Sequence, residues 1–398
     1  MHKKIKILVI VPSEFCFGLQ NLTLSFFSRL STQAEILFLN AIENDGEFPE
    51  RVRQLGFSQS FTWFGTLSRK LDSKNIKRTV HRLIRLPKIW YDFLKIYREC
   101  KPDIIYFGNF RELILFWPFL AFIRNKVVCH MHDPPPNIFF QRLSFRFWSK
   151  GVGHFIFISN NVRTRLRILG KISASEIVIH NGIEINEIIA PRVRSDMFAK
   201  RFGWPADCVI VGITGQMHLN KGHQDFIDAA TRCAQINRRL RFVIGGKPSG
   251  PDYFRIAKYV ESTGMNDLFG FSGWLNRSGE FFNGLDIFVL ASRHDEGFGL
   301  VVAEAMERAV PVIATKSGGA VEIIKDKFDG YLIEKRAPQE LANAILNLAN
   351  DKALRTRMGE SARNHIIAEF NIARKVKDFS FHLSGIAQPA ANVSRYGM

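Results

Sequence analysis

Short apolar runs alternate with longer amphipathic stretches along almost the whole chain. Near-continuous apolar runs are typical of strands buried on both faces of a sheet, whereas apolar residues spaced three and four apart are typical of helices. The clearest strand candidates are 5–11, 34–39, 103–107, 127–130, 155–158, 209–214, 241–245, 287–291 and 312–315. Strands separated by helical stretches in this way predict parallel sheets covered by helices, and hence an α/β fold.

A polar, charged stretch interrupts this pattern between residues 185 and 205, and a second strand–helix series restarts at Val209. We therefore expect two Rossmann-like domains facing each other across a cleft, with residues 1–190 forming the first and residues 191–370 the second. Residues 371–398 are expected to form a C-terminal helix that returns to the first domain, followed by a tail. In such sheets, ligands bind beyond the carboxyl ends of the strands.

Composition narrows the class of protein. The chain has 398 residues, of which 46% are hydrophobic and 23% charged, and these values exclude wholesale disorder. Its 5 cysteines include no Cys-x-x-Cys pair, which argues against a disulfide framework or a zinc ribbon and favours a reducing cytosol.

The apolar run 5–11 is interrupted by Lys6 and is not followed by a small-residue cleavage site. We interpret it as a first strand rather than an export signal, and expect a cytoplasmic protein.

The formal net charge of +18 suits an anionic partner, such as nucleic acid, phospholipid or a phosphorylated substrate. Between Lys74 and Lys88, basic residues recur at spacings of three and four with apolar residues between them, which predicts a helix with one cationic stripe. Pro87 is expected to end or kink this helix. An ordinary solvated helix face is the alternative interpretation. We favour peripheral binding of residues 74–88 to an anionic membrane at the cytoplasmic leaflet.

The most informative window runs from Phe271 to Ile324 and predicts the order strand, glycine loop, helix, strand, glycine loop, helix. Its first loop contains Glu296-Gly-Phe-Gly299, and the helix that follows contains Glu304. The glycines allow close approach of a ligand, and the helix N-terminus offers free N–H groups to phosphate or hydroxyl oxygens. Carboxylates near such a loop suit a ligand with several hydroxyl groups. Taken alone, the two glutamates are explained equally well as solvated residues that flank an ordinary turn.

The order of several motifs makes the window specific. They are Glu296-Gly-Phe-Gly, Glu304-Ala-Met, Pro311-Val-Ile-Ala-Thr and Ser317-Gly-Gly. In this order they resemble retaining glycosyltransferase family 4, whose members have the two-domain glycosyltransferase-B (GT-B) fold. Further segments resemble elements of the same family: Asn181-Gly-Ile-Glu, Gly215-Gln-Met-His-Leu-Asn-Lys221-Gly and Phe242-Val-Ile-Gly-Gly. The resemblance is close from about residue 127 to 335 and diffuse before that.

The resemblance implies roles for individual residues of the second domain. Lys221 would be the counter-charge of the donor diphosphate, Glu296 would contact the sugar hydroxyls, and Glu304 the ribose hydroxyls. The remaining residues expected in the donor site are Gly215, Gln216, Gly297, Phe298 and Gly299. The family usually has arginine where this chain has Gln216. Three possibilities remain open: another cation takes its place, the donor is held more weakly, or transfer is slow.

The first domain is expected to supply the acceptor side. The resemblance places His132, at the end of the predicted strand 127–130, beside the donor sugar. His130 lies two residues earlier on the same face, and we interpret it as a satisfied polar group. In the loop after the first strand, relatives have a glycine pair that approaches the donor phosphate, and only Gly18 is available here. We interpret Glu14 as loop polarity rather than as an acceptor-side base.

The function implied is that of a retaining glycosyltransferase. It would move a hexosyl group from a nucleotide-diphosphate sugar to a glycan or lipid-linked acceptor in cell-surface polysaccharide synthesis, by front-face attack. The chain has no Asp-x-Asp motif, so we expect neither a required metal nor a cofactor besides the donor substrate. The alternatives are a nucleotide-sugar epimerase, a phosphorylase-like protein, or an inactive nucleotide-binding or basic interaction protein.

Two further classes are disfavoured by missing motifs. A dinucleotide oxidoreductase would need Gly-x-Gly-x-x-Gly after the first strand, and the chain does not have it there. No helix-turn-helix or zinc finger is recognisable, so a nucleic-acid partner is not expected.

Overall fold

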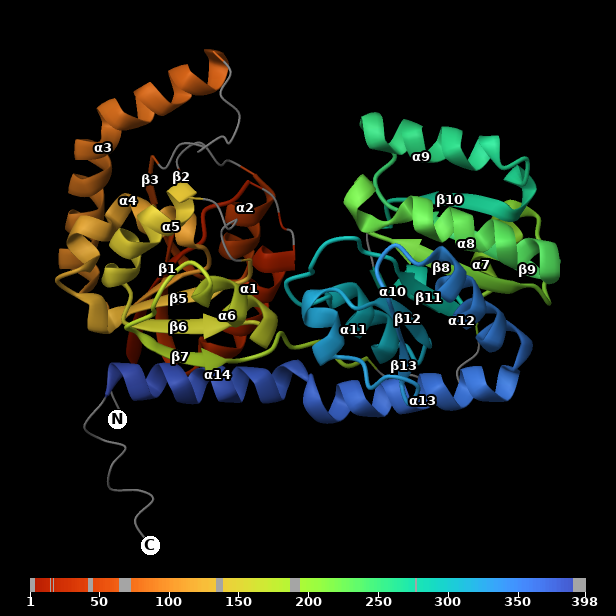
Figure 1. The fold of residues 1–398 in the computed structure, drawn as a ribbon. Helices are drawn as coiled ribbons and strands as arrows, with labels where there is room; N and C mark the ends of the chain where they lie inside the picture. The colour runs from red at the N-terminus through yellow and green to blue at the C-terminus, as the bar shows by residue number, and fades with distance from the viewer. Residues whose placement is uncertain are drawn as a thin grey trace, which may run out of the picture. The chain divides into compact units, whose positions relative to one another are not determined.

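The computed structural model describes residues 4–14, 16, 18–41, 46–63, 73–133, 139–186, 194–275 and 278–388, with only the backbone described at 73–83, 140 and 278. The chain divides into two compact units (Figure 1). The first contains Met1–His180 together with Ala373–Met398, and the second contains Asn181–Ile372.

The division falls after His180 rather than at the expected boundary between residues 190 and 191. The reason lies in the backbone bonds of Ile183, which pair this segment with the end of the second unit. Ile183 donates to the carbonyl of Phe370 at 2.7 Å, and Ile372 donates to the carbonyl of Ile183 at 3.0 Å. The residues just after His180 therefore belong to the second unit.

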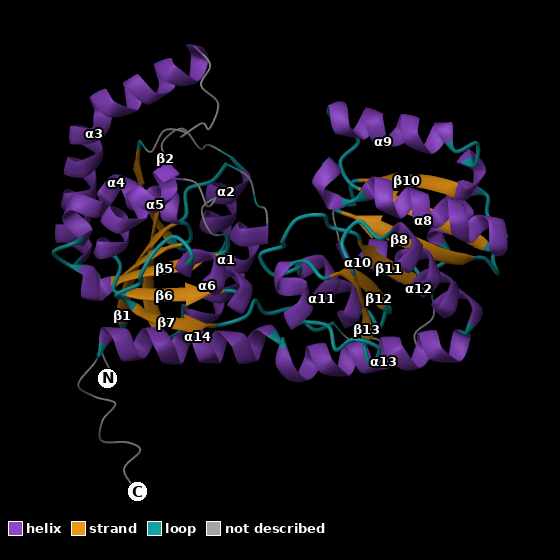
Figure 2. Ribbon diagram, in the orientation of Figure 1, coloured by secondary structure: helices purple, strands orange, loops and turns teal. Residues whose placement is uncertain are grey.

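The first unit contains a seven-stranded parallel sheet of order β3-β2-β1-β4-β5-β6-β7. Its strands are β1 (Ile5–Ile10), β2 (Ala34–Ala41), β3 (Ser58–Thr62), β4 (Ile104–Phe107), β5 (Val127–Met131), β6 (His154–Phe157) and β7 (Ser175–Val178). Its helices are α1 (Gly18–Leu30), α2 (Glu47–Gln54), α3 (Ser73–Cys100), α4 (Phe110–Leu120), α5 (Phe139–Trp148), α6 (Asn160–Arg167) and all but the first residue of α14 (Ile372–Ala387). Figure 2 shows these helices around the strands.

Helix α14 joins the core of the first unit through Phe379. The ring of Phe379 lies 5.1 Å from that of Phe26 and 5.9 Å from those of Phe27 and Tyr106, measured between centroids. All four side chains are buried. Burial of one such aromatic side chain stabilises a fold by about 2–3 kcal/mol, so α14 is an integral part of the first unit although it follows the second along the chain.

Two helices of the first unit contain an internal proline. Helix α3 does not end at Pro87 but continues to Cys100, and Figure 1 shows it changing direction along its length. Helix α4 contains Pro118, and its residues Leu113 and Phe116 are fully buried. No helix in the described ranges combines the length and apolar character needed to cross a bilayer.

The second unit contains a six-stranded parallel sheet of order β10-β9-β8-β11-β12-β13. Its strands are β8 (Val209–Thr214), β9 (Leu240–Gly245), β10 (Phe269–Gly273), β11 (Ile287–Leu290), β12 (Val312–Thr315) and β13 (Gly330–Ile333). Its helices are α7 (Met197–Phe202), α8 (His223–Ile236), α9 (Pro251–Ser262), α10 (Ser278–Asn283), α11 (Leu300–Glu307), α12 (Pro338–Asn350) and α13 (Lys352–Glu369). Two parallel sheets with helices on their faces confirm the predicted α/β fold.

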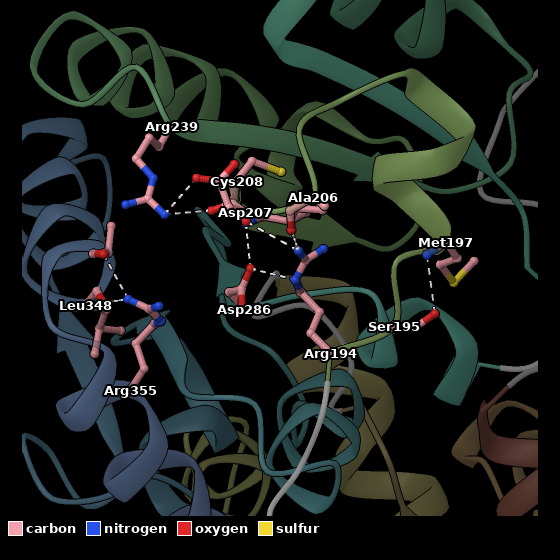
Figure 3. A network of polar contacts seen from close by, with 12 residues as sticks. Arg194, Ser195, Met197, Ala206, Asp207, Cys208, Arg239, Asp286, Leu348 and Arg355 are labelled. Atoms are coloured by element: carbon pink, nitrogen blue, oxygen red, sulfur yellow. Dashed lines mark hydrogen bonds and ion pairs between the residues drawn. The ribbon is translucent and has the colours of Figure 1, made fainter.

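A polar network fastens the start of the second unit to the amino ends of its central strands (Figure 3). Asp286, just before β11, accepts a hydrogen bond from the backbone N–H of Ile210 at 2.8 Å. It also forms an ion pair with Arg194 at 3.1 Å. Arg194 also donates to the carbonyl of Ala206 at 2.9 Å. This network lies at the amino ends of β8 and β11, whereas ligands of parallel sheets bind beyond the carboxyl ends of the strands.

Candidate active site

Two glycine-containing loops meet at the carboxyl ends of the neighbouring strands β8 and β11. Gly222 ends the loop after β8 with φ +74°, and a Cβ atom there would lie 1.8 Å from the carbonyl oxygen of Ala291. The backbone N–H of Arg293 donates to the carbonyl of Asn220 at 2.8 Å. Only glycine permits both the left-handed backbone and this close approach, so Gly222 is what allows the two loops to touch.

Lys221 and Glu296 form an ion pair across these loops. The Lys221 Nζ atom donates to Glu296 Oε1 at 2.8 Å and to Oε2 at 2.9 Å, and the hydroxyl of Ser292 donates to Oε1. The side chains of Lys221 and Glu296 are 24% and 14% exposed, so solvent and ligands can reach them. A lysine ammonium has three donors, so this geometry leaves Lys221 capacity to bind an anionic group as well.

A second ion pair holds the loop after β11 onto helix α8. Arg293 donates from Nε to Asp225 Oδ2 at 2.8 Å and from Nη2 to Oδ1 at 2.6 Å. The hydrogen bond to Asp225 raises the pKa of Arg293, since the carboxylate favours the charged guanidinium. This pair could not be predicted from the sequence, because an arginine and an aspartate 68 positions apart carry no local signal. It stiffens the loop that presents Glu296.

The segment Gly297–Gly299 leads into helix α11. Gly299 is the N-cap residue with φ +104°, and no side chain caps the helix. The N–H of Val302 donates to the carbonyl of Gly299 at 2.9 Å, so an external acceptor at this end of the helix would meet the N–H groups that precede Val302. The ring of Phe298 is buried and lies 5.7 Å from the ring of Phe370, so its side chain packs within the second unit.

The other expected donor-site residues of the second unit are distributed over neighbouring elements. Gly215 follows β8 with φ +154°, and Gln216 beside it is exposed. Glu304 lies within α11 and is half-buried. The structure thus places Lys221 and Glu296 in direct contact, whereas Gln216 lies in the loop after β8 and Glu304 lies on α11.

The two expected residues of the first unit lie on different elements. Gly18 begins α1, and His132 directly follows β5. The His132 ring lies 4.4 Å from the ring of His130, whose Nδ1 is 2.7 Å from the hydroxyl of Tyr106. Burial lowers the pKa of His132 to about 3 and that of His130 well below its ordinary value. Both imidazoles are therefore neutral near pH 7.

Stability is expected to fall as the pH is lowered from about 6.5, the pKa of an unfolded histidine. Burial lowers the pKa of His132 to about 3 and that of His223, the first residue of α8, to about 4. Below about pH 6.5 the unfolded chain binds protons that the folded chain does not, so acid favours unfolding. Thermal unfolding midpoints measured from neutral to mildly acidic pH test this. The variant His223→Gln should show a smaller decrease, and an unchanged pH dependence would contradict the prediction.

The fold of the chain is that of solved GT-B glycosyltransferases. HepE from Anabaena, crystallised in complex with UDP, is similar over 96% of this chain and 100% of its own, with a TM-score of 0.78 and 21% identity. WaaG, a glycosyltransferase involved in lipopolysaccharide biosynthesis, is similar over 95% of this chain and 100% of its own, with a TM-score of 0.68 and 14% identity. These likenesses establish the two-unit GT-B fold for this chain.

The match to a family model lies within the second unit. Residues 195–365 match the family model of glycosyl transferases group 1. The UDP-Gal:alpha-D-GlcNAc-diphosphoundecaprenol alpha-1,3-galactosyltransferase of Escherichia coli is 29% identical over 203 residues, which cover 50% of this chain and 51% of that protein. The lipopolysaccharide core biosynthesis glycosyltransferase LpsE of Rhizobium meliloti is 26% identical over 167 residues, 42% of this chain and 47% of that protein. The matches span about half the length of these curated relatives. The second unit is thus similar to the glycosyl transferases group 1 family over residues 195–365, which are less than half of the chain.

Proposed function

We propose that this protein is a retaining glycosyltransferase that moves a hexosyl group from a nucleotide-diphosphate sugar to a glycan or lipid-linked acceptor. The observation that carries the proposal is the Lys221–Glu296 pair, held where two glycine loops meet within the segment that matches the family model. A cation and a carboxylate in contact at the end of a parallel sheet suit a ligand that is both anionic and rich in hydroxyl groups.

Each of these residues has a distinct role in the proposed reaction. Lys221 and the N–H groups at the start of α11 bind the diphosphate and stabilise the charge that grows on it as it leaves. Glu296 accepts hydrogen bonds from the sugar, and Glu304 accepts them from the ribose. In the first unit, neutral His132 contributes hydrogen bonding rather than charge to the donor sugar. Front-face attack, in which the departing diphosphate takes the acceptor proton, then requires neither a protein nucleophile nor a metal.

The proposed setting is cell-surface polysaccharide synthesis at the cytoplasmic face of the membrane. HepE has been solved with UDP and with UDP-glucose, which makes uridine nucleotides the first donors to test. The cationic stripe 74–88 remains a proposed membrane contact, and the side chains of 74–83 lie outside the described residues. Of its described cations, Arg85 lies over the ring of Trp63 at 4.9 Å and Lys88 is 3.4 Å from Asp92.

A donor screen tests the proposed function. UDP-, GDP-, ADP- and dTDP-sugars are incubated with the protein. Release of free sugar or its transfer to a lipid extract is followed by mass spectrometry, and the anomeric configuration of the product by proton NMR. Transfer or slow hydrolysis of one donor with retained anomeric configuration supports the proposal. Interconversion of two nucleotide sugars would favour an epimerase, and sugar phosphate formed only with inorganic phosphate would favour a phosphorylase.

The variant Gln216→Arg is expected to bind UDP more tightly than the natural chain does. Gln216 is exposed in the loop that leads to Lys221, and arginine adds a permanently charged, bidentate donor for phosphate oxygens. Isothermal titration with UDP measures the change, and we expect about tenfold tighter binding. Titration with uridine is the control and should show no change. Unchanged or weaker UDP binding by a folded variant would mean that this position does not face the diphosphate.

A further inference from the structure

Helix α5 of the first unit has an exposed apolar stripe that the core does not use. Phe139, Leu143 and Phe147 recur at intervals of four residues and are 73%, 45% and 50% exposed. Residues four apart on a helix lie on one face, so these three side chains form a continuous line. The buried face of the helix is separate and consists of Phe145 and Trp148, each 1% exposed.

Two exposed aromatic side chains lie near the end of α4, and one of them, Trp117, extends this apolar stripe. Helices α4 and α5 lie next to each other, as Figure 1 shows. The ring of Trp117 on α4 is 6.3 Å from that of Phe147, and Phe122, just beyond the helix, is 90% exposed. Clusters of exposed aromatic residues of this kind are rare on soluble proteins and mark a contact surface.

A cationic stripe runs beside the apolar one. Arg142, Arg146 and Lys150 also recur at intervals of four residues, and all three are exposed. The segment 139–151 contains no aspartate or glutamate, so its charge is entirely positive. A surface that meets both stripes must therefore accept aromatic side chains and supply negative charge.

We propose that these two stripes form a docking surface for an anionic lipid bilayer. Aromatic and leucine side chains insert at the boundary between headgroups and acyl chains, while arginine and lysine beside them bind lipid phosphates. The chain's net charge of +18 adds a long-range attraction to the same surface. This surface is distinct from residues 74–88 on α3. The proposal rests on the proposed function only in assigning this surface a purpose, which is access to a lipid-linked acceptor. Vesicle binding itself requires no sugar transfer and can be tested independently.

Vesicle co-sedimentation tests the proposal with two variants of the full chain. The cationic variant carries Arg142→Gln, Arg146→Gln and Lys150→Gln, and the apolar variant carries Leu143→Ser and Phe147→Ser. Each cation near an anionic surface contributes about fivefold to partitioning, so the cationic variant should bind vesicles that contain phosphatidylglycerol about a hundredfold more weakly. The apolar variant should bind at least about tenfold more weakly, because it loses two inserting side chains. High salt should weaken the vesicle binding of the natural chain and of the apolar variant. It should change the vesicle binding of the cationic variant less.

Matched controls make the result specific to α5. The variant with Arg232→Gln, Arg238→Gln and Lys258→Gln loses the same charge from exposed positions of the second unit and should bind like the natural chain. Circular dichroism and thermal unfolding verify that each variant is folded. Equal binding by the cationic variant and this control would overturn the proposal. So would a loss seen only on changing Lys77, Arg78, Arg82 and Arg85, or self-association through Phe147 without vesicle binding.

Discussion

Replacing Lys221 with alanine is expected to weaken the binding of UDP about ten- to hundredfold and to leave the binding of uridine nearly unchanged. The variant removes a charged hydrogen bond to the diphosphate, and such a bond contributes about 1.5–3 kcal/mol. Uridine carries no phosphate, so its contacts do not depend on the ammonium group. Isothermal titration with UDP and uridine, measured on the natural chain and on Lys221→Ala, gives both affinities directly.

A matched control for this variant is Lys200→Ala. Lys200 lies on α7 of the same unit, is exposed, and forms a 2.8 Å ion pair with Asp196. Its loss removes the same charge without touching the candidate site, so UDP binding should remain that of the natural chain. Equal losses of UDP and uridine affinity in Lys221→Ala would place Lys221 away from the phosphates.

Replacing Glu296 with glutamine is expected to lower sugar transfer at least about tenfold without a loss of UDP affinity. Glu296 is oriented by Lys221 and by the hydroxyl of Ser292, and glutamine keeps its shape while removing its charge. The lost charged hydrogen bond to the sugar is worth about 1.5–3 kcal/mol, most of it in the transition state. UDP affinity should be equal or higher, because the ammonium group of Lys221 is no longer neutralised by a carboxylate. Steady-state transfer rates and UDP titration on the same variant test both parts.

The control for Glu296→Gln is Asp196→Asn, which neutralises the carboxylate of the exposed pair on α7. It should transfer sugar at the natural rate. If Glu296→Gln were folded and retained near-normal transfer, Glu296 would have no contact with the sugar. A fall in UDP affinity with unchanged turnover would instead assign the Lys221–Glu296 pair a purely structural role in holding the two loops together.

The strands of both sheets were largely predictable from the sequence, because buried parallel strands are apolar at successive positions. The predicted strands at 209–214 and 312–315 coincide with β8 and β12. Strand β3 (Ser58–Thr62) was not predicted, because it lies at the edge of its sheet and contains mostly polar residues. Its pairing with β2 depends on tertiary contacts that no local pattern reveals.

The candidate site was predictable only in part. The motif around Glu296 identified the loop, but not the contact of Glu296 with Lys221, which lies 75 positions earlier in the chain. The role of Asp225 in fixing Arg293 likewise depends on the approach of α8 to the loop after β11. Phe298 lies within the glycine motif and was expected in the donor site, but its ring is buried in the core of the second unit. Local sequence therefore indicates where a loop lies, whereas long-range packing decides which of its atoms a ligand can reach.

Hydrogen exchange with and without a nucleotide sugar tests the central claim most directly. The account predicts that UDP-glucose, or whichever donor the screen selects, slows amide exchange in the loop 215–223 and at the start of α11, residues 297–302, both of which lie at the carboxyl edge of the second sheet. This protection should be weaker in Lys221→Ala and unchanged in Lys200→Ala. If none of the four nucleotide-sugar classes protected these two segments, or if protection appeared only elsewhere in the chain, the assignment of a donor site to the second unit would be contradicted.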